Sequence, residues 1–225
     1  MRVASGSGDD PAIAARTDDV TGVPPVPPRV AVAPGRFAFG PAVARFDRWA
    51  DVQLERLRGN PVADVVFPSA TALGDWSLIW HIVNVSRGLT GGRRAEQVPM
   101  LAVAIGAESL IVNQGLKRIF RRPRPTVEGD PRYPVRRPLT SSFPSGHASA
   151  AAFNAVLLTA WDGKRAAPLW WGLATVVGAS RAFVRIHHAS DVVAGMATGA
   201  VLGVAARRVL RRGGIRTALA TLANA

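Results

Sequence analysis

The sequence predicts an all-α fold, a multi-pass membrane helical bundle with about five spanning helices. The mean hydropathy is +0.14, although Lys and Arg outnumber Asp and Glu by 28 to 15 among 225 residues, for a net charge of +13. Apolar helices joined by arginine-rich loops explain both values. The chain contains neither a stretch of alternating apolar and polar residues, which would indicate a strand, nor an internal repeat.

Five apolar stretches are the candidate spanning helices, at residues 72–89, 98–120, 148–161, 168–186 and 192–210. Several are shorter than the roughly 20 residues that cross a bilayer, and polar residues such as Asp75, Glu108 and Arg181 interrupt them. Buried helices of a large soluble bundle are therefore the alternative. Small residues such as Gly195 and Gly199 are abundant in the last two stretches, which favours close packing of membrane helices.

The remaining segments differ in composition. Residues 1–36 predict a disordered, Pro-rich tail, because proline removes the backbone donor that a helix needs. Residues 37–71 predict an amphipathic interfacial helix, at 41–57, and a linker. This helix is too charged to span a bilayer, so it lies in the interface with Trp49 as an anchor, packs on a neighbour, or covers a soluble domain. Residues 72–212 form the membrane domain and 213–225 a C-terminal tail.

Three groups of polar residues stand at the ends of the apolar stretches. The first contains Lys117 and, after six intervening residues, Arg124 followed by a proline. Two cations where a helix gives way to a loop can hold phosphate oxygens, Arg through its planar fork and Lys as a compact charge. The neighbours Arg118, Arg121 and Arg122 leave the alternative of a solvated or lipid-facing basic cluster.

The second group is Pro144, Ser145, Gly146 and His147, directly before the stretch that begins at residue 148. A turn of small residues that opens into a helix presents free backbone N–H groups and the positive end of the helix dipole, which favour an anion. His147 can give or take a proton beside such an anion. The alternative is that Ser145 only caps the helix and His147 is a surface residue of the first turn.

The third group is Ser180 and Arg181, then His187, then Asp191. The spacing of His187 and Asp191 brings the carboxylate beside the imidazole, either on a helix or in a turn before one. Asp191 would then orient His187 and stabilise its cationic form. His188 points elsewhere and is given no role. A structural hydrogen bond is the alternative for this pair.

The charge of these groups indicates an anionic ligand rather than a metal ion. His147, His187 and Asp191 could form a site of two histidines and one carboxylate, but three cations nearby would repel a divalent metal and attract a phosphate. The cations are Lys117, Arg124 and Arg181. The chain has no cysteine, which excludes a thiolate nucleophile and cysteine-ligated zinc.

Together, the three groups resemble the signature of the type 2 phosphatidic acid phosphatase family. The family pattern is Lys, six residues and Arg-Pro; then Pro-Ser-Gly-His; then Ser-Arg, five residues, His, three residues and Asp. The sequence matches all eleven specified positions between residues 117 and 191. The family includes lipid phosphatases, bacterial acid phosphatases and vanadium haloperoxidases, and the resemblance implies a helical bundle with the active site at one end.

The resemblance also implies a role for each matched residue. His187 is similar to the nucleophile that forms a phosphohistidine, oriented by Asp191, and His147 to the general acid. Neither a metal nor another cofactor is implied. The phosphate-binding residues of the family match Lys117, Arg124, Ser145, Gly146 and Arg181.

The expected function is that of an integral-membrane phosphatase acting on a lipid phosphate or diphosphate, with no nucleic-acid partner. The candidate substrates are phosphatidic acid, phosphatidylglycerol phosphate, and polyprenyl phosphates or diphosphates such as undecaprenyl diphosphate. A soluble-type acid phosphatase or haloperoxidase of the same fold, and a basic lipid- or nucleic-acid-binding protein without catalysis, are the alternatives. High Ala and Arg content is typical of a GC-rich bacterium, so we expect the bacterial inner membrane, with the active site facing outward by the positive-inside rule.

Overall fold

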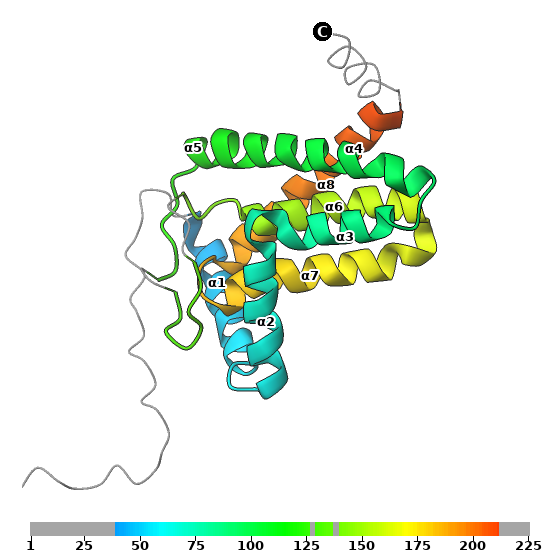
Figure 1. The fold of residues 1–225 in the computed structure, drawn as a ribbon. Coiled ribbons are helices and arrows are strands. Elements are labelled where there is room, and N and C mark those ends of the chain that lie inside the picture. Colours follow the sequence, from blue (N-terminus) through cyan, green and yellow to red (C-terminus); the bar gives the residue numbers. More distant parts are fainter. Residues whose placement is uncertain (1–38, 127–128, 137–139, 212–225) are drawn as a thin grey trace, which may run out of the picture. The chain divides into compact units, whose positions relative to one another are not determined.

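The computed structural model describes residues 39–126, 129–136 and 140–211. All of them lie within one compact unit, residues 32–225. The tails expected at residues 1–36 and 213–225 fall outside the described residues, as do residues 37–38 and 212. Every regular element in the described ranges is helical (Figure 1), in agreement with the all-α prediction.

Two helices precede the predicted membrane domain. Helix α1 spans Gly40–Glu55 and α2 spans Pro61–Gly74. The Asn60 side chain caps α2 by accepting hydrogen bonds from the amides of Val62 and Ala63, at 2.9 and 3.2 Å. Proline suits the first helical position, where its missing N–H is not needed. Residues 61–71, expected to be part of a linker, are therefore helical.

The apolar stretch at 72–89 is not one helix. A short 3-10 segment, Asp75–Ser77, separates α2 from α3, Leu78–Gly88. Trp76 and Ser77 have positive φ values of 56° and 59°. The sequence did not predict this break, because the hydropathy pattern carries no information on left-handed backbone conformations. The break leaves Asp75 at the turn between two helices.

The longer helices follow. Helix α4, Arg93–Ser109, continues through a π-helical segment, Leu110–Leu116, into the short α5, Lys117–Ile119. Helices α6, Gly146–Asp162, α7, Ala167–Phe183, and α8, Ala189–Arg211, complete the bundle. Within the described ranges, two helices are long and apolar enough to cross a membrane, Arg93–Ile119 and Ala189–Arg211. The expectation of about five spans is thus not established by helix length and composition.

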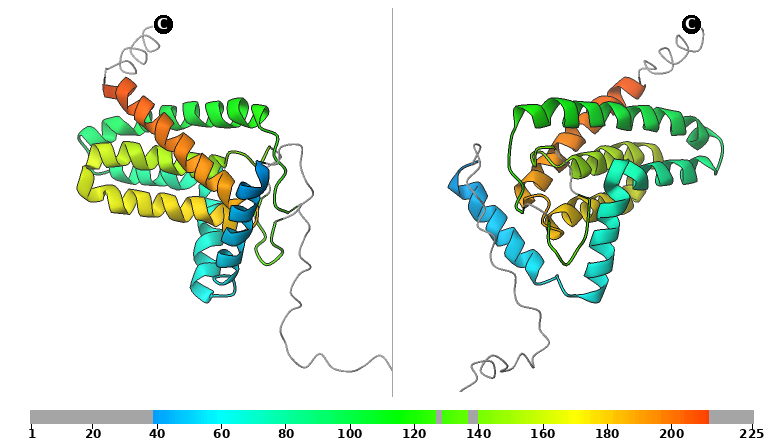
Figure 2. Two further views of the ribbon diagram at one scale, coloured as in Figure 1. Left: turned by 180° about the vertical axis from the view of Figure 1, so that it is seen from behind. Right: turned by 60° about the vertical axis from the view of Figure 1, so that its left-hand side comes forward.

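Helix α6 is the centre of the bundle, and α7 and α8 pack along it (Figure 2). Glycines of α8 make the contact with α6 possible. A Cβ at Gly195 would overlap the Ser145 carbonyl oxygen, and one at Gly199 would overlap that of Ser149. Both pairs are offset by the same number of residues, so α6 and α8 run in the same direction. This close approach places the start of α8 beside the start of α6.

We expect Gly199→Ala to destabilise the protein, although alanine is the better helix former by about 1 kcal/mol. The added methyl group must push α8 away from the Ser149 carbonyl, at a cost of about 1–3 kcal/mol. Gly172→Ala in α7 is the matched control, because a Cβ there meets no atom within 4 Å. Thermal unfolding in detergent checks this: a Gly199→Ala protein as stable as Gly172→Ala would contradict the packing argument.

Candidate active site

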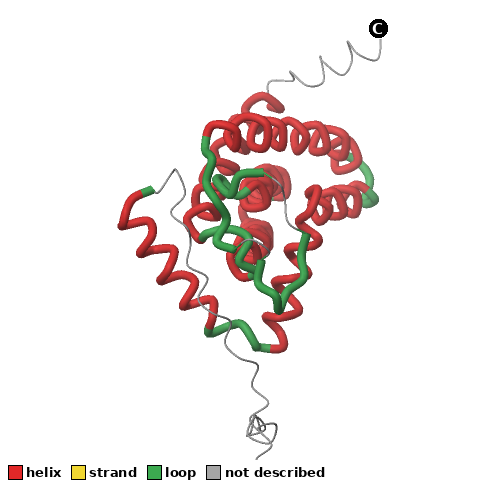
Figure 3. Tube along the Cα trace, turned by 90° about the vertical axis from the view of Figure 1, so that its left-hand side faces the viewer, coloured by secondary structure: helices red, strands yellow, loops and turns green. Residues whose placement is uncertain are grey.

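The three predicted groups meet at one end of the bundle, here called the site end. Figure 3 looks onto this end, where loops cover the ends of the central helices. Lys117 lies at the end of the α4–α5 helix, Ser145 caps the start of α6, and Arg181 is in the last turn of α7. His187 lies in the turn between α7 and α8.

Lys117 from the first group lies near Gly146 of the second group. Its Nζ lies 3.5 Å from where a Cβ of Gly146 would stand, and Asn113 Oδ1 lies 3.0 Å from the same point. Glycine is therefore the residue that lets both side chains approach the start of α6. Lys117 is buried, and its Nζ donates to Thr140 Oγ1 at 3.3 Å.

Ser145 has the capping role that the sequence left open. Its hydroxyl accepts a hydrogen bond from the Ala148 amide at 3.4 Å, and its own amide donates to the Asp191 carbonyl at 3.0 Å. That amide is therefore not available to an anion, contrary to the expectation for this turn. The second group can still offer the Ser145 hydroxyl hydrogen and the amides of the first turn of α6, beginning with Gly146.

The third group forms the predicted histidine and carboxylate pair. His187 precedes α8 and Asp191 lies in its first turn, so the pair is presented by a turn rather than by one helix face. His187 Nδ1 lies 3.6 Å from Asp191 Oδ2, and both side chains are buried. The amide of His188 donates to the same carboxylate oxygen at 2.9 Å, whereas the His188 ring makes no contact with His187.

Residues that the motifs do not include hold Asp191 in place. The buried Ser142 hydroxyl donates to Asp191 Oδ2 at 2.5 Å and lies 3.4 Å from His187 Nδ1. Arg122 donates to Asp191 Oδ1 at 2.5 Å and to Asp47 of α1 at 2.6 Å. Arg122 is therefore a buried structural partner of the site and not a member of a solvated basic cluster.

The cations of the site surround His187. Arg124 donates to the carbonyls of Ile186 and Thr140, both at 3.0 Å, and its Nη1 lies 3.2 Å from His187 Nε2. Burial lowers the pKa of His187 well below its usual value, and the charges of Arg124 and Arg181 lower it further, against the opposing effect of Asp191. The imidazole is therefore neutral near pH 7, with a lone pair available.

Arg181 is completely buried, at 0% exposure. None of its three guanidinium nitrogens has a hydrogen-bond partner within the described part of the chain. Asp75 is close enough to act on this charge electrostatically, but a buried guanidinium without hydrogen-bond acceptors is costly, and such a group in a native protein is typical of an anion-binding site. Lys117 and Arg124 are near enough to act on it electrostatically, so the three cations predicted to bind phosphate share one region.

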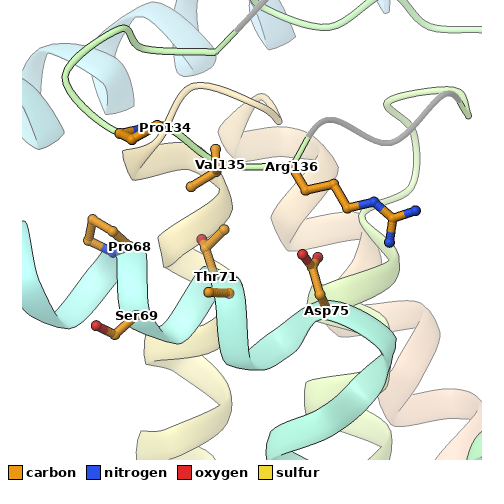
Figure 4. Close-up of a pocket in the computed structure, with 8 residues that line it drawn as sticks. Pro68, Ser69, Thr71, Asp75, Pro134, Val135 and Arg136 are labelled. Atoms are coloured by element: carbon orange, nitrogen blue, oxygen red, sulfur yellow. The ribbon is translucent and has the colours of Figure 1, made fainter.

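His147 lies on the other side of the site, against the break between α2 and α3. Its Nε2 is 3.0 Å from Asp75 Oδ1, the distance of an ion pair when the ring is protonated, although the contact does not have the geometry of a hydrogen bond. Asp75 also borders a cavity of about 420 Å³ that the end of α2 forms with residues 134–136. Figure 4 shows Asp75 and Arg136 directed toward one another across this cavity. Arg136 lies over the Trp76 ring, 5.0 Å from its centroid.

The metal-site alternative has no geometric support in the described ranges. No group of three His, Asp or Glu side chains there is arranged to hold a metal ion. His147 approaches Asp75 and His187 approaches Asp191, so the two histidines have different carboxylate partners.

Comparisons with known proteins agree with this arrangement. Two solved structures share the fold, each at 23% sequence identity and each aligned over 77% of this chain. One is the transmembrane PAP2 type phosphatidylglycerolphosphate phosphatase from Bacillus subtilis, with a TM-score of 0.60 over 88% of its length. The other is LpxE from Aquifex aeolicus, with a TM-score of 0.59 over 97% of its length. No curated protein sequence matches the chain significantly.

The family comparison covers the site. The model of the PAP2 superfamily matches residues 98–214, a range that includes all three motif groups, helices α6, α7 and α8, and most of α4. Asp75 and α1 lie outside the match. The chain is a member of the PAP2 superfamily, with the all-helical fold of its membrane phosphatases.

Proposed function

We propose that the protein is an integral-membrane phosphatase that hydrolyses a lipid phosphate or diphosphate monoester through a phosphohistidine, without a metal ion. The observation that carries this proposal is Arg181, a buried guanidinium without a partner in the described chain, beside a neutral buried histidine. A phosphoryl group supplies the hydrogen-bond acceptors that the Arg181 guanidinium lacks among the described residues.

In the first step, Nε2 of His187 attacks phosphorus while Asp191 accepts a hydrogen bond from Nδ1–H and stabilises the positive charge that forms on the ring. The bond from phosphorus to the leaving oxygen breaks, and His147 donates a proton to that oxygen. Lys117, Arg124 and Arg181 stabilise the charge on the non-bridging phosphoryl oxygens.

In the second step, neutral His147 takes a proton from a water molecule whose oxygen attacks the phosphohistidine. The bond from phosphorus to His187 breaks, the electron pair returns to Nε2, and inorganic phosphate leaves. His147 is then protonated again, ready for the next substrate. Each half-reaction uses the same two histidines in reversed roles.

Apolar residues of helix α1 are exposed, which supports a position of this helix at a membrane surface. Its Asp47 points inward to Arg122, whereas Trp49 and Val52 are 60% and 55% exposed. A helix on a soluble domain has the opposite arrangement, with its apolar side inward. We infer that α1 lies in the interface and that α4–α5, α6, α7 and α8 cross the bilayer, whereas α3, at 11 residues, is shorter than a span.

We also propose that the site end faces away from the cytoplasm. Several arginines at this end are neutralised in the structure, so they count little as topology signals. The pairs are Arg122 with Asp47 and Asp191, and Arg132 and Arg185 with Asp130 and Glu55. The opposite end has Arg93, Arg94, Lys164 and Arg165 in its short loops, which the positive-inside rule places in the cytoplasm.

A pair of single cysteines in a chain without native cysteine tests this orientation. Pro131 at the site end and Lys164 at the opposite end are both exposed. We expect Pro131→Cys to react with a membrane-impermeant thiol reagent in intact cells and Lys164→Cys to react only after lysis. The reverse pattern would place the active site in the cytoplasm.

The pH dependence follows from His187. The nucleophile must be neutral, and its pKa is lowered by burial and by Arg124. Protonation therefore removes activity only when the pH falls through this lowered value, so kcat/KM should stay high at pH 6 and fall at a more acidic pH. An acidic limb at or above pH 6.5, the usual histidine value, would contradict the assignment.

Hydrolysis by the purified protein in detergent is the test of the function. The substrates to compare are phosphatidic acid, phosphatidylglycerol phosphate, and undecaprenyl phosphate and diphosphate. We expect phosphate release from at least one of them to persist in EDTA and to be inhibited by vanadate, which imitates the pentacoordinate phosphoryl group. Activity that requires an added divalent metal, or no release from any of them, would contradict the proposal.

A further inference from the structure

Asp75, which lies close to His147, is outside the three motif groups and outside the family match. Asp75 lies in the break between α2 and α3, 72 positions before His147 in the chain. The His147 side chain is 14% exposed and that of Asp75 is 24% exposed, so the contact is mostly shielded from solvent. Shielding makes such a pair stronger than one on the surface.

The backbone around Asp75 is shaped to receive the imidazole. A Cβ at Gly74 would stand 2.5 Å from His147 Cδ2 and 3.2 Å from Nε2, so only glycine lets the ring lie against the end of α2. Helix α2 ends at Gly74, Asp75 is extended, and the positive φ values of Trp76 and Ser77 keep the chain from continuing as the same helix. Both features bring the Asp75 carboxylate within 3.0 Å of Nε2.

We propose that Asp75 is the positioning residue for the general acid, holding the hydrogen of His147 on Nε2 so that Nδ1 faces the substrate. This inference rests on the proposed function. The imidazolium gives its Nδ1 hydrogen to the leaving oxygen as the bond from phosphorus to that oxygen breaks. The remaining hydrogen stays on Nε2 beside Asp75, which leaves the Nδ1 lone pair to take the proton of the attacking water.

Asp75 also stabilises the positively charged form of His147. The charged groups that face His147 are Asp75 from the break, Arg181 from α7 and Lys117 from α5. Both cations oppose a positive charge on the ring, and Asp75 is the carboxylate that favours it. The site thus has two histidine and carboxylate pairs, His187 with Asp191 and His147 with Asp75.

The dependence of the rate on the leaving group tests this role. An alkyl phosphate needs protonation of its leaving oxygen, whereas 4-nitrophenyl phosphate releases a stable anion and needs little. We expect Asp75→Asn to lower kcat/KM for dioctanoyl phosphatidic acid by about 10- to 100-fold, part of the full effect of a general acid. The loss on 4-nitrophenyl phosphate should be at most about threefold. Equal losses on both substrates, or no loss, would overturn the proposal.

A double-mutant cycle separates positioning from a structural role. If Asp75 acts only through His147, adding Asp75→Asn to His147→Asn should change the rate by less than about twofold. If the rate loss of the double mutant equalled the product of the two single losses, Asp75 would act independently of His147. Arg136→Gln is the control for the other neighbour of Asp75 and should leave the ratio of the two substrates unchanged. If the wild-type protein hydrolyses neither substrate nor any lipid phosphate, the proposed function fails, and not this inference alone.

Discussion

Replacing His187 with alanine is expected to lower kcat by more than about 10⁴-fold, because no other group can form the phosphoryl intermediate. The side chain is buried, at 2% exposure. Its removal leaves a small cavity beside Ser142 and Asp191, and we expect a loss of stability of about 1–3 kcal/mol. The protein should therefore still fold, and initial rates together with thermal unfolding in detergent measure the two effects separately.

His188→Ala is the matched control for this experiment. The ring of His188 lies 3.9 Å from Asp47 and makes no contact with the nucleophile, so the substitution should change kcat by less than about threefold. If His187→Ala kept more than about 1% of the wild-type rate and His188→Ala did not, the adjacent histidine would be the nucleophile and the assignment would be wrong.

Arg181→Met is expected to change activity and stability in opposite directions. Methionine has a similar length, but it cannot bind a phosphoryl group, so kcat/KM should fall by about 10²- to 10³-fold. The same change removes a fully buried charge that has no hydrogen-bond partner in the described chain. Without ligand, the variant should therefore be more stable than the wild type, by about 1–4 kcal/mol.

The stabilisation of the protein by a bound ligand tests directly whether Arg181 binds phosphate. Inorganic phosphate or vanadate should raise the unfolding temperature of the wild type, because a ligand that binds only the folded state stabilises it. The rise should be much smaller for Arg181→Met. Arg181→Lys keeps the charge but loses the planar fork, so it should lie between the two. A variant that loses both stability and activity would indicate that Arg181 is structural.

Most of the site was predictable from sequence because its residues occur in short, regularly spaced groups. These residues lie at helix ends or in the loops between helices, and the packing of α6 against α7 and α8 brings those ends together. They are Lys117, Arg124, His147, Arg181 and His187. The roles of these residues stay predictions until they are tested. The spans were less predictable, since several apolar stretches are shorter than a bilayer and helix length alone does not distinguish a buried helix from a spanning one.

The supporting residues could not be predicted, because each reaches the site by a long-range contact. Asp75 contacts a residue 72 positions later in the chain, and Ser142 contacts one 49 positions later. Arg122 was hidden in a run of arginines, and its carboxylate partners come from α1 and α8. A spacing rule detects residues that are neighbours on one turn or helix, and none of these pairs is of that kind.

Trapping of the phosphoryl group tests the central claim most directly. The purified protein is mixed with a ³²P-labelled lipid phosphate and quenched in alkali, which preserves phosphohistidine, and the labelled peptide is identified by mass spectrometry. We expect the label on His187, none in His187→Ala, and accumulation of label in His147→Asn if the loss of the base slows hydrolysis of the intermediate more than its formation. Label on Ser145, or turnover without any labelled protein when the intermediate is sampled within one turnover, would contradict the phosphohistidine mechanism.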